Sequence, residues 1–238
     1  MLNYIKAQSE ADFTKSGVQV LKEFIQRAIT QRGRCILGLS GGSTPQLIYE
    51  KLGKEDIDWS KLTIFLVDER YIASDDEKSN QKMVCETLLK NASIPESNII
   101  FPNTQLSPEE CVADYASRLK KMIDEQGWLP DVVTLGLGED GHIASLFPPI
   151  QPSTINRQQS TAQSLVLHTQ TNRFEVKDRI TLTLNVIASA QNHIFFLKGK
   201  GKKKVWDEMM ESKEDEKRWP AKRVLESEET TVVYTECS

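Results

Sequence analysis

The sequence has few of the residues that form disulfides or bind metals. Cysteine occurs 4 times in 238 residues, at Cys35, Cys85, Cys111 and Cys237, with no CxxC pair and no histidine at zinc-ligand spacing. We therefore expect reduced thiols, no metal site and no cofactor that depends on one. Histidine is scarcer still, with 3 residues, so each is weighed separately below.

Long apolar runs and a large excess of one charge are also absent. No stretch approaches the roughly 18 apolar residues that cross a bilayer, and residues 1–10 lack the basic and apolar regions of a secretory leader. The 30 Lys+Arg against 34 Asp+Glu give a formal net charge of -4, which does not suit a nucleic-acid or acidic-lipid surface. We expect a cytoplasmic protein, a monomer with no nucleic-acid or membrane partner, that meets any anionic ligand at a local site.

The sequence does contain an alternation of strand-like apolar runs and amphipathic helical stretches. Strands are predicted at residues 35–39, 62–67, 131–135, 164–168, 193–198 and 230–235, and helices at 9–31, 79–90, 107–123 and 202–211, with a further helix from residue 45. This rhythm predicts an α/β fold, a Rossmann-like mainly parallel sheet with helices on both faces. Residues 148–163 are a candidate boundary, but strands resume after them, so the prediction is one domain over residues 1–238.

A glycine-rich turn follows the first strand in this rhythm. Gly41 and Gly42 precede Ser43-Thr44-Pro45, which predicts a hydroxyl N-cap with proline at the first helical position. Glycines let the backbone approach a ligand, and free N–H groups at a helix start favour an anion. The turn is a phosphate site or a plain tight turn. Residues 38–42 also match the G-x-S-x-G elbow of serine hydrolases, although the helix starts too late after the serine.

Charges follow the next predicted strand directly, in Asp68-Glu69-Arg70. Ligands of such sheets bind at the carboxyl ends of the strands, where Arg70 can hold a phosphate by paired hydrogen bonds and Asp68 can accept sugar hydroxyls. The alternative is an Asp–Arg ion pair on the surface.

The third site is the glycine-rich segment LGLGEDGHIASLFP at residues 135–148, again after a strand. It presents His142 between two acids on one side and an apolar segment on the other, and an imidazole is a natural general base near neutral pH. His168 and His193 sit at the edges of strand-like runs and are expected to be structural. Arg179 lies in DRITLT. Five lysines within residues 198–204 indicate a solvated face, from which one lysine at a helix start can reach an anion.

At this point the sequence resembles the 6-phosphogluconolactonases. The resemblance rests on LGLSGGSTP, FLVDERY with Ser79-Asn80, LGLGEDGHIASLFP, DRITLT and GKGK, in this order over nearly the whole chain. It implies a single α/β domain without metal or nucleotide that opens 6-phosphoglucono-1,5-lactone to 6-phosphogluconate. By position, His142 matches the family's general base, and the substrate and phosphate contacts match Gly41, Gly42, Ser43, Thr44, Asp68, Arg70, Arg179 and Lys202. Asp140 is a candidate for orienting His142.

Two alternatives share parts of this pattern. Glucosamine-6-phosphate deaminases resemble the chain in the glycine loop and DGHIA, but they have MDEY in place of VDER at residues 67–70 and FNEP in place of SLFP at residues 145–148. Non-catalytic sugar-phosphate sensors place a helix-turn-helix before the domain, whereas the α/β pattern here begins within the first few residues. The family's prolines near the DRITLT arginine are replaced by residues 174–178, which leaves the path of the Arg179 loop open.

Overall fold

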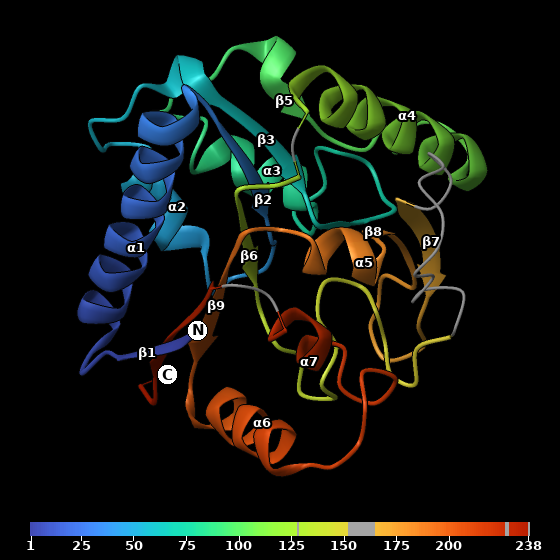
Figure 1. Ribbon diagram of the computed structural model, residues 1–238. Helices are drawn as coiled ribbons and strands as arrows, with labels where there is room; N and C mark the ends of the chain where they lie inside the picture. Colours follow the sequence, from blue (N-terminus) through green and yellow to red (C-terminus); the bar gives the residue numbers. More distant parts are fainter. Residues whose placement is uncertain (128, 152–164, 227–228, 238) are drawn as a thin grey trace.

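The computed structural model describes residues 1–127, 129–151, 165–226 and 229–237. Its centre is a parallel sheet with the strand order β1-β10-β9-β6-β2-β3-β5 (Figure 1). These strands are β1 (Leu2–Lys6), β2 (Cys35–Leu39), β3 (Leu62–Leu66), β5 (Ile99–Ile100), β6 (Val132–Leu135), β9 (Asn192–Lys198) and β10 (Glu229–Thr235). β2 and β3 are buried along their whole length, as expected for apolar runs covered on both faces. The α/β fold class is confirmed.

Helices cover both faces of this sheet (Figure 1). On one face lie α1 (Glu10–Arg32), α2 (Gln46–Leu52) and α3 (Asn80–Glu86); on the other lie α4 (Pro108–Gln126), α5 (Leu184–Ala188), α6 (Lys200–Glu211) and α7 (Ala221–Val224). α4 begins with the predicted capping box between Ser107 and Glu110. No helix in the described part of the chain is long and apolar enough to cross a membrane.

The start of α2 corrects a prediction. The helix begins at Gln46 after Pro45, and no side-chain hydrogen bond caps it. The hydroxyl N-cap predicted from Ser43 and Thr44 is therefore wrong, because these residues belong to the turn between β2 and the helix. α3 ends at Glu86 rather than Lys90, and α6 begins two residues earlier than predicted, at Lys200.

A second, antiparallel sheet was not predicted. It has the order β4-β8-β7 and consists of β4 (Asp68–Arg70), β8 (Asp178–Leu182) and β7 (Val166–Gln170). Val67 connects the sheets: its N–H donates to Leu39 O of the large sheet at 3.0 Å, and its C=O accepts from Leu182 N of the small one at 2.9 Å. The candidate boundary at residues 148–163 lies largely outside the described residues.

Candidate functional site

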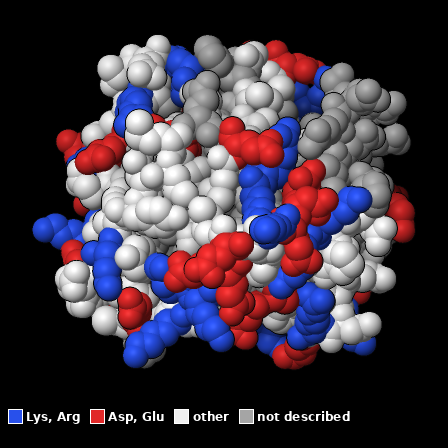
Figure 2. Space-filling model, turned by 60° about the horizontal axis from the view of Figure 1, so that its bottom comes forward, with Lys and Arg blue, Asp and Glu red and all other residues white. Residues whose placement is uncertain are grey.

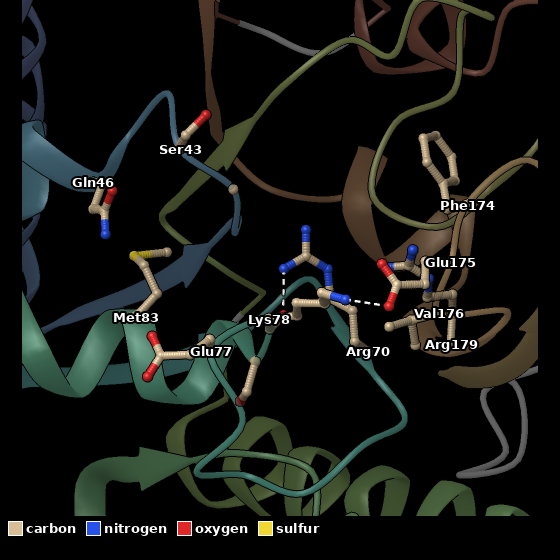
Figure 3. Close-up of a pocket in the computed structure, with 12 residues that line it drawn as sticks. Ser43, Gln46, Arg70, Glu77, Lys78, Met83, Phe174, Glu175, Val176 and Arg179 are labelled. Atoms are coloured by element: carbon tan, nitrogen blue, oxygen red, sulfur yellow. Dashed lines mark hydrogen bonds and ion pairs between the residues drawn. The ribbon is translucent and has the colours of Figure 1, made fainter.

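A cleft of about 710 Å³ opens where β2, β4 and β6 end. The structure places every residue of the predicted site in its lining: Gly41, Gly42, Ser43, Thr44, Asp68, Arg70, His142, Arg179 and Lys202. A smaller cavity of about 360 Å³, drawn in Figure 3, adjoins the cleft. The two share Gly42, Ser43, Arg70, Phe174 and Arg179. Parallel strands that end at one edge bring these distant segments together.

The glycine loop after β2 is anchored at its start by side chains of α2 and β6, and its backbone N–H groups are free to bind a ligand in the cleft. Tyr49 Oη donates to Ser40 O at 3.1 Å and lies 2.7 Å from Thr134 Oγ1, which fixes the start of the loop. Gly41 must be glycine, because a Cβ there would lie 1.8 Å from Asn80 Oδ1. Within the described residues, the N–H groups of residues 41–44 have no hydrogen-bond partner. The loop therefore offers free amide donors to an anion.

Ser40 does not have the surroundings of a nucleophile. Its hydroxyl lies 3.4 Å from Thr134 Oγ1, and its N–H donates to the same oxygen at 2.9 Å. The next helix begins only at Gln46. Among the described non-glycine residues, only Ala144 has a positive φ, so Ser40 is not on the strained turn that the serine elbow requires.

Two arginines face each other across the small sheet. Arg70 on β4 is directly opposite Arg179 on β8, and like charges in this position repel. Burial, and then the neighbouring Arg70, lower the pKa of Arg179. Arg70 Nη1 donates to Lys78 O at 2.6 Å, and in the described structure neither arginine forms an ion pair with a carboxylate (Figure 3). Because an anion between them would relieve this repulsion, the pair is a suitable phosphate ligand.

The two acids beside Arg70 have other partners, so the surface ion pair considered above is wrong. Asp68 is buried, and its Oδ2 accepts from Ser145 Oγ at 2.6 Å. Glu69 is fully buried at the start of α3, where it accepts from the backbone N–H groups of Asn80 and Gln81, each at 2.8 Å. Burial raises the pKa of Glu69 despite these hydrogen bonds. Glu69 therefore ties β4 to α3, while Asp68 faces the cleft.

His142 lies on a tight loop after β6 and is paired with a carboxylate. Its Nδ1 is 2.5 Å from Asp140 Oδ1, and Gly138 N donates to His142 O at 2.8 Å. Burial acts to raise the pKa of Asp140, but the hydrogen bonds from His142 and Arg173 outweigh it, so this pKa lies well below its usual value. A carboxylate at Nδ1 selects the tautomer in which Nδ1 carries the proton, which leaves Nε2 as the basic nitrogen.

The other two histidines play no part in the cleft lining. His193 is fully buried in β9, with Nε2 at 2.7 Å from Ile187 O, and burial lowers its pKa to about 4. His168 on β7 lies with Nε2 at 2.8 Å from Asp178 Oδ1. These positions agree with the structural roles predicted for both.

Lys202 is the lysine of its cluster that reaches the cleft. Lys203 and Lys204 instead pair along α6 with Asp207 and Glu208, and Figure 2 shows such charges of both signs interleaved on the surface that faces the viewer. Burial lowers the pKa of Lys202, against the opposing effect of Glu139 and Asp140. Lys202 adds a positive charge to the cleft beside those of Arg70 and Arg179.

Two further residues, Arg173 and Phe174, line the cleft and were not among the predicted site residues. They lie between β7 and β8, where Arg173 Nη1 donates to Asp140 Oδ2 and the Phe174 ring lies 5.6 Å from that of His142, centroid to centroid. No motif or periodicity marks residues 171–177, so only the fold reveals these contacts. Arg179, whose loop path was left open, lies on a regular strand.

The fold and this cleft define a Rossmann-like α/β protein in which a histidine–carboxylate pair and several cationic side chains line one cleft. The family model described as "Glucosamine-6-phosphate isomerases/6-phosphogluconolactonase" matches residues 8–233, and the chain belongs to this family.

Curated relatives and solved structures extend this match. The chain is 42% identical to the "Probable 6-phosphogluconolactonase" of Dictyostelium discoideum, over 99% of this chain and 98% of the relative. It is 34% identical to the 6-phosphogluconolactonase of Synechocystis sp., over 83% and 80% of the two chains. The crystal structure of 6-phosphogluconolactonase from Thermotoga maritima superposes with a TM-score of 0.85 at 25% identity, covering 99% of both chains. A monomeric glucosamine-6-phosphate deaminase shares the fold, with a TM-score of 0.78 at 19% identity over 98% of this chain and 97% of that one.

Proposed function

We propose that this protein hydrolyses 6-phospho-D-glucono-1,5-lactone to 6-phospho-D-gluconate, the lactone-opening step of the oxidative pentose phosphate pathway. The observation that carries the proposal is that the His142–Asp140 pair and the Arg70–Arg179 pair line one cleft. The substrate has the matching groups, an electrophilic carbonyl and a phosphate. The names of the relatives support the same activity.

The phosphate is held by the cationic side of the cleft. Arg70, Arg179 and Lys202 supply positive charge, and the free N–H groups of residues 41–44 supply directed donors. Asp68 accepts hydrogen bonds from the sugar hydroxyls. Anchoring the phosphate in this way holds the lactone carbonyl beside His142, so that attack by water becomes effectively intramolecular.

His142 acts as the general base. Its Nε2 takes a proton from water while the water oxygen bonds to the lactone carbonyl carbon, and Asp140 stabilises the imidazolium that forms. The tetrahedral intermediate then breaks its bond to the ring oxygen, which leaves with the proton from Nε2. The ring oxygen becomes a free hydroxyl, and the new carboxylic acid releases its proton to solvent and becomes the carboxylate. The lactone ester is reactive enough to need no covalent intermediate.

The test is hydrolysis of freshly generated lactone, followed by acid release and corrected for spontaneous opening. Ammonia release from glucosamine 6-phosphate is measured in parallel. We expect acceleration of lactone opening and no ammonia. Ammonia release without lactone opening would indicate a deaminase, and tight binding of 6-phosphogluconate without either reaction would indicate a sensor.

A further inference from the structure

The connection between β7 and β8, residues 171–177, reaches over the loop that carries His142. Its base is closed by a hydrogen bond from Thr171 N to Lys177 O at 3.0 Å. The Phe174 ring packs against His142 and, at 5.9 Å between centroids, against Phe147. Figure 3 shows Phe174 beside the cleft, above Glu175 and Arg179. The connection is thus a wall of the site, although it lies far from His142 in sequence.

Arg173 contacts the His142 loop at both of its ends. Its Nη1 donates to Asp140 Oδ2, ahead of the histidine, and its Nη2 donates to Pro148 O at 3.2 Å, behind it. The other carboxylate oxygen, Asp140 Oδ1, is the one at 2.5 Å from His142 Nδ1, and it also accepts from His142 N at 3.2 Å. Each oxygen of Asp140 therefore has its own partner. This arrangement fixes the plane of the carboxylate.

We propose that Arg173 is a positioning residue for His142 and acts through Asp140. The guanidinium holds the carboxylate in the orientation that keeps the imidazole aligned, and its charge keeps that carboxylate ionised. The proposal rests on the function proposed above, because it assigns His142 as the base. Arg173 itself lies outside the motifs of the resemblance.

A purely structural role for Arg173 predicts a different result. Its side chain is 48% exposed, and ion pairs exposed to this degree add little to stability. The effect of removing it should therefore appear in kcat and not in the melting temperature. Lys177 offers a matched control, since it is an exposed cation on the same connection and no ion pair or hydrogen bond of its side chain links it to His142 or Asp140 in the described structure.

The experiment measures kcat, KM and the pH profile of lactone opening for six proteins: wild type, Arg173→Ala, Arg173→Lys, Asp140→Asn, the double variant Arg173→Ala/Asp140→Asn, and Lys177→Ala. We expect Arg173→Ala to lose about tenfold or more in kcat at a nearly unchanged KM, because misalignment affects the chemical step. Arg173→Lys should recover only part, since an ammonium cannot make both contacts. Lys177→Ala should behave like wild type.

The pH profile and the double variant show whether Arg173 positions His142 or only stabilises the fold. With Arg173 removed, the pH below which kcat falls should move upward, because loss of a nearby cation favours the protonated imidazole. The other charged groups around the pair, Glu139, Lys202 and Arg218, are unchanged. If Arg173 acts through Asp140, adding Arg173→Ala to Asp140→Asn should cost little further kcat.

The outcomes are distinguishable. An inactive wild type would refute the proposed function itself. An active wild type with Arg173→Ala within about twofold of it and an unshifted pH profile would overturn the role of Arg173, as would full additivity in the double variant. If Arg173→Ala fails to fold, Arg173→Gln, which keeps a planar donor, replaces it. The same loss in kcat and the same shift of the pH profile then test the role of Arg173.

Discussion

His142 is the residue on which the proposed chemistry depends most directly. We expect His142→Ala to lower the rate of lactone opening by roughly 10²- to 10⁴-fold, the range for loss of a positioned general base. His168→Ala serves as the control, because His168 lies outside the cleft lining and pairs with Asp178. Both variants are assayed for activity and melting temperature. Wild-type turnover by folded His142→Ala would contradict the assignment.

Ser40 tests the competing nucleophilic mechanism. Its hydroxyl lies beside Thr134 and is not paired with a histidine, so we expect no covalent labelling by a fluorophosphonate probe. Mass spectrometry of the treated protein measures this. Stoichiometric modification of Ser40 with matching loss of activity would establish a serine hydrolase instead.

Substitution of Arg70 tests whether its side chain contributes to substrate binding or to the stability of the fold. A charge-assisted hydrogen bond to an anion contributes about 1.5 to 3 kcal/mol, so Arg70→Ala should lose roughly 10- to 150-fold in kcat/KM at a nearly unchanged melting temperature. The defect should shrink for unphosphorylated gluconolactone, because wild type has already lost the same contact there. Arg27, in an exposed pair with Glu229, is the control arginine. An equal loss on both lactones would reassign Arg70 to the sugar or to positioning Asp68.

Among the elements, the loop after β6 requires glycine at position 138 but not at position 136. A Cβ on Gly138 would lie 2.0 Å from His142 Nδ1, whereas a Cβ on Gly136 would meet nothing within 4 Å. Gly138→Ala should therefore displace the imidazole and lower kcat by about tenfold or more, while Gly136→Ala stays close to wild type. Kinetics of the two variants at one temperature provide the comparison. Similar losses in both would show that loop flexibility, and not the space beside His142, sets the rate.

The inner strands of the large sheet were predictable because they are mostly buried and appear as short apolar runs, as in Cys35–Leu39, whereas the edge strand β5 has only 2 residues and was not predicted. The small sheet was not. Asp68–Arg70 is charged at every position, and only its pairing with Asp178–Leu182 makes it a strand, so tertiary contact overrides local propensity. The two strands are 5 residues or shorter, too short to show a clear period.

In the candidate site, too, the residues that follow predicted strands could be identified from the sequence, whereas contacts between segments distant in sequence could not. Glycines, charges and a histidine directly after predicted strands identified its lining, because strand ends meet at one edge. The contacts of Arg173 with Asp140 and of Ser145 with Asp68 join segments 33 and 77 residues apart, which no local pattern reports. The roles of the site residues, and the organisation as one domain, stay predictions.

For the molecule as a whole, His193 links stability to pH. Burial lowers its folded-state pKa from 6.5 to about 4, so the unfolded chain binds this proton first as the pH falls. The contribution of neutral His193 to the free energy of unfolding is complete above pH 6.5 and is lost as the pH falls from 6.5 to about 4. Over this interval the free energy of unfolding falls by at most about 1.4 kcal/mol per pH unit. Denaturant unfolding from pH 7 to pH 4 measures it, and His193→Gln should flatten the curve over this interval. Parallel curves for the two proteins would contradict the assignment.

The backbone of Val67 connects the two sheets that line the cleft, and this connection affects which ligands the cleft can bind. Through its N–H it belongs to the sheet that carries the glycine loop, and through its C=O to the sheet that carries the arginine pair. Val67 thus joins the strand before the glycine loop to the strand pair that carries Arg70 and Arg179. We therefore expect substitutions of side chains on β4 and β8 to change ligand affinity while leaving the parallel core, and the backbone spacing between the glycine loop and the arginine pair, unchanged.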